Sequence, residues 1–227
     1  MDINLSYMEF DKVVSSRRTC RDYKEKDFPA SILAQILETA RFAPSSANMQ
    51  NWRFIIVKDK TKREAIADMC KGQYWMADAP VQVVICNMRK DVQNLFPDKG
   101  ELFSIQNCAI IAAHLMLKAQ DVGIASAFVG AFDEEKLRRS LDIPEDVVPE
   151  MIITLGYPNE LDEEQARDDA RYLTFFEKWG KKDNESSIWP LSKTLGTFTK
   201  KASQSANMAK TSASSSLSKI REKLRKN

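Results

Sequence analysis

Three arginines and a threonine lie within the five residues Arg17-Arg18-Thr19-Cys20-Arg21. A guanidinium group can bind two phosphate oxygens at once, and it stays protonated at any working pH. The segment is therefore suited to hold a phosphate group of a ligand. A solvated basic turn has the same composition, and the segment taken alone favours that plainer interpretation.

A second polar stretch, residues 43–52 with the sequence APSSANMQNW, connects a predicted helix to a predicted strand. Its two hydroxyls and three side-chain amides fall within seven residues. Amide groups both donate and accept hydrogen bonds, which suits a ring with mixed polar edges such as the pyrimidine side of a flavin. An ordinary polar loop explains Pro44 and Ser45, but it explains Gln50 and Trp52 poorly.

A third stretch, residues 126–133 with the sequence SAFVGAFD, runs from a predicted strand through Gly130 to a predicted helix start. Unpaired backbone N–H groups at such a junction can point at a ligand. A tight strand-to-helix turn would require a glycine in any case, so a purely structural interpretation stays open.

The elements that must position these residues alternate between helix and strand. The sequence pattern predicts helices over residues 7–16, 29–40, 62–69, 102–120 and 133–141, and strands over residues 53–59, 81–86, 125–129 and 151–156. The helix at 102–120 is apolar almost all round, so we expect it to be central and buried. Together these elements predict an α+β fold, an α/β sandwich with helices on both faces of a sheet.

The charge distribution separates a C-terminal tail from the rest of the chain. Residues 191–227 hold nine basic side chains and one acid, a formal charge of +8, whereas the preceding residues carry −6. The tail is rich in Ser, Ala and Lys and cannot bury enough apolar surface to fold alone. We expect a folded domain over residues 1–185 and a basic tail over residues 186–227. The tail is expected to be disordered or partly helical, since apolar side chains recur at helical spacing in its last ten residues.

Composition excludes several classes of protein. The four cysteines show neither a C-x-x-C pair nor a disulfide framework, so we expect reduced thiols in a cytoplasmic protein, with Cys20 as a core residue. His114 is the only histidine, which excludes a histidine-rich metal site, and no metal is expected. No apolar run reaches the roughly 18 residues of a membrane span, and the N-terminus does not resemble a secretory signal. If the chain is an enzyme, a cofactor supplies its chemistry.

The polar motifs together resemble the nitroreductase family of FMN enzymes. The RRTCR segment at 17–21, the APSSANMQNW block about 26 residues further on and the GYP motif at 156–158 occur in the family's order and at suitable spacing. The resemblance covers roughly residues 8–180, and the Pro-Ser-Ser-x-Asn-x-Gln part is its most specific motif. The family commonly has Gln-Pro-Trp where this chain has Gln-Asn-Trp at 50–52, a departure that we expect to affect backbone stiffness more than ligand chemistry.

The resemblance also implies which positions bind the cofactor. The FMN phosphate, the ribityl chain and part of the ring edge would be held by Arg17, Arg18, Thr19 and Arg21. The resemblance implies that the amide-rich loop either reaches the flavin from the other subunit or lines the flavin's second side. The residues concerned are Pro44, Ser45, Ser46, Asn48 and Gln50. The flavin N5 would be approached by the backbone of Val129, Gly130 and Ala131. A late arginine, Arg171 or else Arg167, would meet the phosphate.

The resemblance further implies a mostly antiparallel sheet and an obligate homodimer with FMN at the interface. The implied reaction is ping-pong transfer of hydride from NADH or NADPH to nitroaromatics, quinones or similar electron-poor small molecules, with no catalytic side chain. Enoyl reduction, dehalogenation and flavin destruction stay open, because one scaffold can support several reactions. A contact between the basic tail and an anionic surface also stays open, whereas no nucleic-acid partner is expected.

Overall fold

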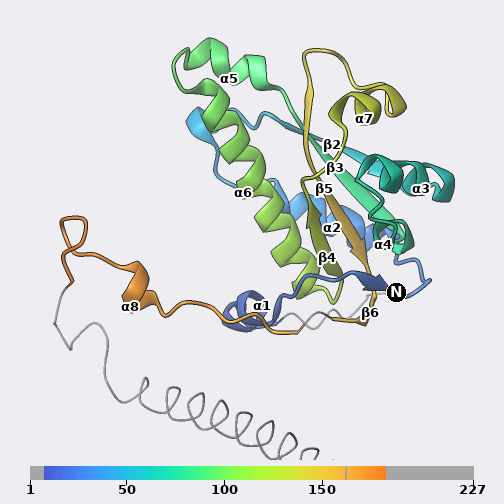
Figure 1. Ribbon diagram of the computed structural model, residues 1–227, viewed down its shortest axis with the longest axis horizontal. Coiled ribbons are helices and arrows are strands. Elements are labelled where there is room, and N and C mark those ends of the chain that lie inside the picture. The colour runs from blue at the N-terminus through green and yellow to red at the C-terminus, as the bar shows by residue number, and fades with distance from the viewer. Residues whose placement is uncertain (1–7, 162, 183–227) are drawn as a thin grey trace, which may run out of the picture. The chain divides into compact units, whose positions relative to one another are not determined.

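The computed structural model describes residues 8–161 and 163–182 (Figure 1). The helices are α1 (Phe10–Ser16), α2 (Ala30–Ala40), α3 (Lys60–Met69), α4 (Trp75–Asp78), α5 (Arg89–Leu95), α6 (Gly100–Asp121), α7 (Glu134–Ser140) and α8 (Ala170–Leu173), with a 3-10 turn, η1, at Ser46–Asn48. The strands are β1 (Asp22–Tyr23), β2 (Trp52–Val57), β3 (Val81–Asn87), β4 (Ala125–Val129), β5 (Val148–Gly156) and β6 (Pro158–Glu160). Each predicted helix and strand is present, whereas the predicted tail at 186–227 lies outside the described residues.

The main sheet has four strands in the order β2-β3-β5-β4, and every neighbouring pair is antiparallel. Successive side chains of a strand point to opposite faces. In β3, Val83 and Ile85 therefore join the core on one face, while Val84 and Cys86 join the core on the other. Strands β1 and β6 form a separate antiparallel pair. The prediction of a mostly antiparallel sheet is confirmed.

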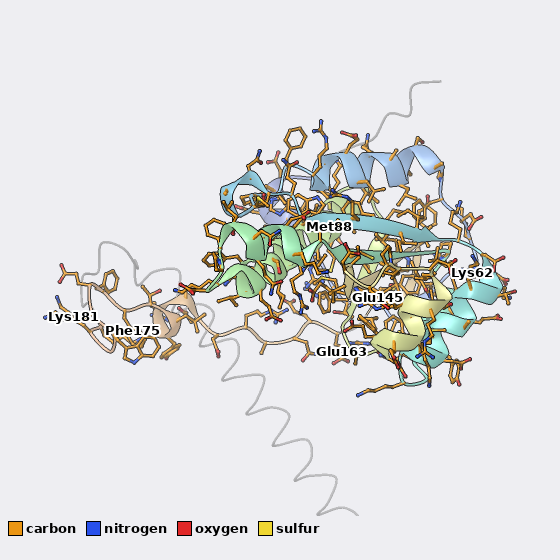
Figure 2. The ribbon with its side chains drawn as sticks, turned by 90° about the horizontal axis from the view of Figure 1, so that it is seen from above. Lys62, Met88, Glu145, Glu163, Phe175 and Lys181 are labelled. Atoms are coloured by element: carbon orange, nitrogen blue, oxygen red, sulfur yellow. The ribbon has the colours of Figure 1, made fainter. Side chains whose placement is uncertain are left out.

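Helices cover both faces of the main sheet, and their side chains fill the space against it (Figures 1 and 2). Ile36 of α2 and Leu115 of α6 are fully buried on one face. Ile66 of α3 and Leu137 of α7 are fully buried on the other. Each such side chain contributes about 1.5–3 kcal/mol through the hydrophobic effect. The predicted α+β sandwich is confirmed.

Helix α6 spans 22 residues and is long and apolar enough to cross a membrane. It is instead a core helix, because its own side chains Ile111, Leu115 and Ala119 are buried in the hydrophobic core. Its burial is less complete than the sequence predicts. Leu102 is 53% exposed and Ile105 is 36% exposed, so one apolar side of α6 faces outward.

The described residues 165–182 belong to a second compact unit, and they contain α8. The Asp169 side chain caps α8 by accepting a hydrogen bond from the backbone N–H of Arg171 at 3.0 Å. The ammonium of Lys182 donates to the carbonyl oxygens of Tyr172 and Thr174 at 2.8 and 3.1 Å. These bonds close the loop that follows α8.

Candidate functional site

The guanidinium-rich segment forms the turn that follows α1. The backbone N–H of Arg17 closes the last turn of the helix, and Arg17, Arg18 and Thr19 are all half-buried. Arg18 donates from Nη1 to the carbonyl of Ser15 at 2.6 Å, and its Nη2 lies 3.1 Å from a carboxylate oxygen of Glu164. Arg18 therefore braces the turn through its own contacts.

This turn is fastened to the edge of the main sheet. Thr19 forms an isolated parallel β-bridge with Ser126 of β4, and the N–H of Cys20 donates to the Ser126 carbonyl at 3.1 Å. Strand β4 continues to Val129, and Gly130 follows as an exposed residue. A strand rises about 3.3 Å per residue, so Gly130 lies roughly 13 Å along the chain from the bridge. One strand thus joins the first and third predicted sets of residues.

Aromatic rings flank the turn and the glycine. The Arg21 guanidinium lies over the ring of Trp75, 5.8 Å from its centroid. Trp75 in turn packs against the cluster that contains Cys20, which is fully buried. Phe128 is 49% exposed on β4, and a Cβ at Gly130 would lie 3.2 Å from its ring. A glycine at position 130 therefore leaves room for this ring beside the backbone.

The amide-rich loop adopts an uncommon backbone conformation. Ala47, Asn48 and Gln50 have φ values of 49°, 58° and 44°, in a left-handed region that residues other than glycine and asparagine seldom adopt. The Gln50 N–H donates to Ser45 Oγ at 3.1 Å, and Gln50 Nε2 donates to Asn48 Oδ1 at 3.1 Å. Residues held in sparsely populated backbone regions cluster at ligand sites. This geometry supports a functional interpretation of the loop.

A buried series of polar side chains holds the loop in place. Asn107 of α6 accepts through Oδ1 from the N–H and the hydroxyl of Ser46, at 3.0 and 3.2 Å. It donates through Nδ2 to Asn51 Oδ1 at 2.7 Å. Asn51 Nδ2 donates to Asn87 Oδ1 at 2.6 Å, and Asn87 Nδ2 donates to Glu150 Oε1 at 2.7 Å. Three of these amides, Asn51, Asn87 and Asn107, are at most 1% exposed.

Sequence reasoning missed this network. The available signal was a pair of polar residues, Ser104 and Asn107, one helical turn apart in an otherwise apolar helix and both buried. The side chain of Asn51 lies at the centre of the network. The expectation that the departure at position 51 affects backbone stiffness more than ligand chemistry stays a prediction.

Within one chain, the turn and the loop are anchored at different points along α6. Ser16, which precedes Arg17, accepts a hydrogen bond from Gln120 Nε2 at 3.1 Å. Ser46 is instead bonded to Asn107. Thirteen helical residues separate Asn107 from Gln120, which corresponds to about 20 Å. Figure 1 shows α1 beside the end of α6 that leads to β4. The structure therefore joins the arginine turn to β4 and anchors the turn and the amide loop of one chain about 20 Å apart along α6.

Comparison with known proteins decides the family. The model of the nitroreductase family matches residues 14–75 and 68–157, which is more than half of the chain. The chain belongs to the nitroreductase family. The resemblance carried by the polar motifs is therefore confirmed.

The alignments with several relatives cover most of the length of those relatives. A candidate NADH dehydrogenase/NAD(P)H nitroreductase of Methanothermobacter thermautotrophicus is 29% identical over 164 residues, covering 70% of this chain and 83% of that protein. The structure of an FMN-dependent nitroreductase from Clostridium difficile R20291 is 26% identical, with a TM-score of 0.64, covering 74% of this chain and 99% of that one. An iodotyrosine deiodinase of Thermotoga neapolitana is 25% identical over 180 residues, covering 72% of this chain and 97% of that protein. These relatives have different named activities.

The late arginine that nitroreductases are expected to use lies in the second unit. Arg171 donates from Nε and Nη2 to the two carboxylate oxygens of Asp169, at 3.0 and 2.9 Å. This pairing lowers the pKa of Asp169 and raises the pKa of Arg171. Arg167 is exposed. The choice between the two arginines as a phosphate ligand stays a prediction.

The four cysteines of this chain are all free and buried. Burial raises the pKa of Cys70 and of Cys86 to about 11, and the pKa of Cys108 to about 12. The prediction of reduced thiols, with Cys20 in the core, agrees with this arrangement. Neutral buried thiols are poor nucleophiles, so they do not provide a reactive group.

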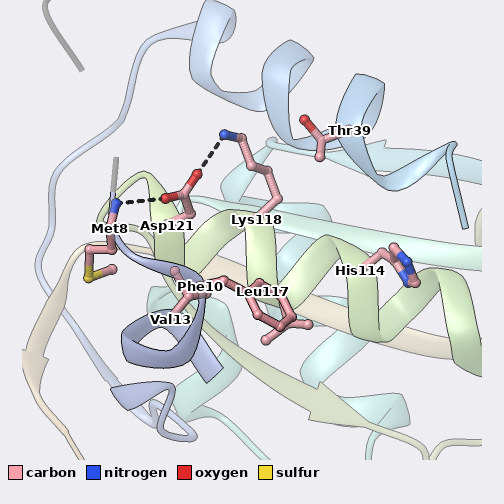
Figure 3. Close-up of a pocket in the computed structure, with 8 residues that line it drawn as sticks. All are labelled: Met8, Phe10, Val13, Thr39, His114, Leu117, Lys118 and Asp121. Carbon is pink, nitrogen blue, oxygen red and sulfur yellow. Dashed lines mark hydrogen bonds and ion pairs between the residues drawn. The ribbon is translucent and has the colours of Figure 1, made fainter. Parts of the chain in front are cut away.

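A separate cavity of about 440 Å³ lies among α1, α2 and α6 (Figure 3). It is lined by Met8, Phe10, Val13, Thr39, His114, Leu117, Lys118 and Asp121. Asp121 accepts hydrogen bonds from the Met8 N–H at 3.0 Å and from the Lys118 ammonium at 2.7 Å. None of the lining residues belongs to the predicted flavin-binding set, so the single histidine lies outside that set.

Proposed function

We propose that this chain is a homodimeric, FMN-dependent NAD(P)H oxidoreductase that reduces small electron-poor molecules such as nitroaromatics and quinones. One observation carries the proposal. The arginine turn, which suits a phosphate, and the amide loop, which suits a flavin ring, are both hydrogen-bonded to α6, and their anchor points on that helix lie about 20 Å apart in one chain. Two copies related by a two-fold axis can bring the turn of one chain to the loop of the other. Relatives named as an NAD(P)H nitroreductase and an FMN-dependent nitroreductase support the choice of cofactors.

The residues fit an FMN. Arg17 and Thr19 place a guanidinium and a hydroxyl on a turn fixed to β4, which suits an anionic phosphate. Asn48 and Gln50 carry exposed amides that can donate to and accept from a pyrimidine edge. Gly130 has no side chain, so a ring could approach its backbone N–H closely. Of the two arrangements implied for the amide loop, the separation along α6 favours contact with the partner's flavin.

Exposed apolar side chains near the start of α6 and on α1 support the dimer. Leu102 and Ile105 of α6 are 53% and 36% exposed, and Phe10 and Val14 of α1 are 70% and 49% exposed. Apolar residues three or four positions apart lie on one side of a helix. A group of large exposed apolar side chains marks an interaction surface. A second copy of the chain is the partner that also completes the flavin site.

In the proposed reaction the cofactor supplies the redox chemistry and the protein binds and orients it. Bound FMN would supply the hydride-transfer chemistry between NADH or NADPH and the acceptor, for which we expect ping-pong kinetics. The side chains of this protein bind the cofactor and orient it. No nucleophile is required, in keeping with buried thiols of raised pKa and a histidine that lines a separate cavity.

Reductive dehalogenation is a second candidate reaction for the same site. The observation that favours it is the similarity to a relative named iodotyrosine deiodinase. Fold and cofactor are the same for both reactions, so the acceptor must be decided by assay.

Steady-state kinetics tests the proposal. The full chain, loaded with FMN, is given NADH or NADPH with a nitroaromatic, a quinone or iodotyrosine. We expect acceptor-dependent nicotinamide oxidation and parallel double-reciprocal plots. Iodide release with no turnover of the other acceptors would assign the second candidate. No oxidation of either nicotinamide by the FMN-loaded chain would contradict the proposal.

A further inference from the structure

We infer that Glu150, Asn87, Asn51 and Asn107 form a directional chain of hydrogen bonds that positions the amide loop for flavin binding. The inference rests on the proposed function, because it assigns a role toward the same FMN site. The three asparagines are at most 1% exposed, so they cannot touch a ligand themselves. They are positioning residues that act through the loop at 45–50.

The loop depends on this anchor. Its left-handed residues, Ala47, Asn48 and Gln50, hold conformations that a free chain seldom populates. Asn107 Oδ1 accepts both the backbone N–H and the hydroxyl of Ser46, at the start of these residues. Without that acceptor, the half-buried Ser46 loses two hydrogen bonds at once, and the backbone of the loop is free to relax.

The direction of the chain is fixed at its far end by a carboxylate. An ionised carboxylate only accepts hydrogen bonds, so Asn87 must turn its amide nitrogen toward Glu150, 2.7 Å away. Arg89 Nη2 lies 3.2 Å from the same Glu150 oxygen and holds the carboxylate in place. Asn87 therefore presents its carbonyl oxygen to Asn51.

This orientation passes along the series. Asn51 meets the Asn87 oxygen with its amide nitrogen, at 2.6 Å, and so turns its own oxygen toward Asn107. Asn107 donates its amide nitrogen to that oxygen at 2.7 Å, which leaves its own oxygen for the loop. Asn51 Nδ2 also donates to the backbone carbonyl of Ser104 at 3.2 Å. Because each amide has one donor side and one acceptor side, Glu150 and the Ser104 carbonyl together set the direction in which Asn107 offers an acceptor to Ser46. A proline at position 51, which nitroreductases commonly carry, could not transmit this direction.

Flavin titration of two variants tests the inference. Asn51→Leu removes the central amide. Glu150→Gln keeps the shape but supplies both a donor and an acceptor, so this end of the chain no longer fixes the direction and only the Ser104 carbonyl still does. We expect the FMN Kd to rise about ten-fold or more in Asn51→Leu and by a smaller factor in Glu150→Gln. We also expect the visible circular dichroism of the bound flavin to change at saturating FMN in both.

Gln82→Met is the matched control. Gln82 is a fully buried amide of the same sheet, and its Nε2 donates to the Met76 carbonyl at 2.9 Å, far from the loop in the sheet register. This variant should lower the melting temperature while leaving the FMN Kd and the circular dichroism unchanged. If Asn51→Leu does not fold, Glu150→Gln carries the test.

The outcomes separate two failures. Wild-type protein that takes up no FMN would refute the proposed function itself. Wild-type protein that binds FMN, together with variants whose Kd and circular dichroism match those of the wild type or of Gln82→Met, would overturn the directional chain alone.

Discussion

Subunit mixing tests whether the flavin site is shared between two chains. One parent carries Arg17→Ala and Thr19→Ala in the turn, and the other carries Asn48→Ala and Gln50→Ala in the loop. A charged hydrogen bond contributes roughly 1.5–3 kcal/mol, so loss of the Arg17 contact alone should raise the FMN Kd by about 10- to 150-fold. At FMN concentrations near the wild-type Kd, both parents should be nearly empty.

The expected recovery follows from the geometry along α6. Random exchange makes about half of the dimers mixed, as expected for a two-fold assembly. If the turn of one chain meets the loop of the other, each mixed dimer has one site with both defects and one site with none. About a quarter of all sites are then intact.

Co-expression of the two parents followed by an NAD(P)H oxidation assay measures this recovery. We expect activity near a quarter of the wild-type value. Activity no higher than the mean of the two parents would refute the reasoning, because it would mean that the turn and the loop of one chain serve the same site.

Three further predictions concern single residues. Arg17→Ala alone should weaken FMN binding by about 10- to 150-fold in a fluorescence titration, and an unchanged Kd would remove Arg17 from the phosphate site. In a urea titration, Gly100→Ala should destabilise the fold by more than the roughly 1–3 kcal/mol of ordinary overpacking, because the new Cβ would lie 2.5 Å from Gln93 Cα. In the same titration Gly130→Ala should be tolerated, because its Cβ would meet only the movable Phe128 ring, at 3.2 Å. The pKa of Cys108 is raised to about 12, so this thiol keeps its proton in the native state at pH values where the unfolded chain loses it. The free energy of unfolding should therefore fall as the pH rises from about 8.5 toward 12, by at most about 1.4 kcal/mol per pH unit for this thiol. Cys108→Ala should make that fall shallower between pH 8.5 and 10, and an identical slope would argue against the raised pKa.

The secondary structure could be predicted because it depends on local periodicity. The spacing of Ile32, Ile36 and Ala40 gives α2 a buried side, and all three are buried. The β-branched run of β3 gives a strand whose alternate side chains enter two cores. Asp133 caps α7 through the N–H of Lys136, as its position before two glutamates predicts.

The site was only partly predictable, because its geometry depends on residues distant in sequence. Arg17 and Gln50 are recognisable by type, but their separation along α6 follows from contacts with Gln120 and Asn107. The importance of Asn51 depends on Asn87 and Asn107, which lie 36 and 56 residues away in the chain. Single-sequence spacing cannot reveal such a network, since each member looks like an isolated polar residue.

Native mass spectrometry of the full chain with added FMN tests the central claim most directly. A flavin site built from the turn of one chain and the loop of another predicts a dimer that carries two FMN molecules, with no flavin on the monomer. A monomer that binds FMN, or a dimer that takes up none, would contradict it.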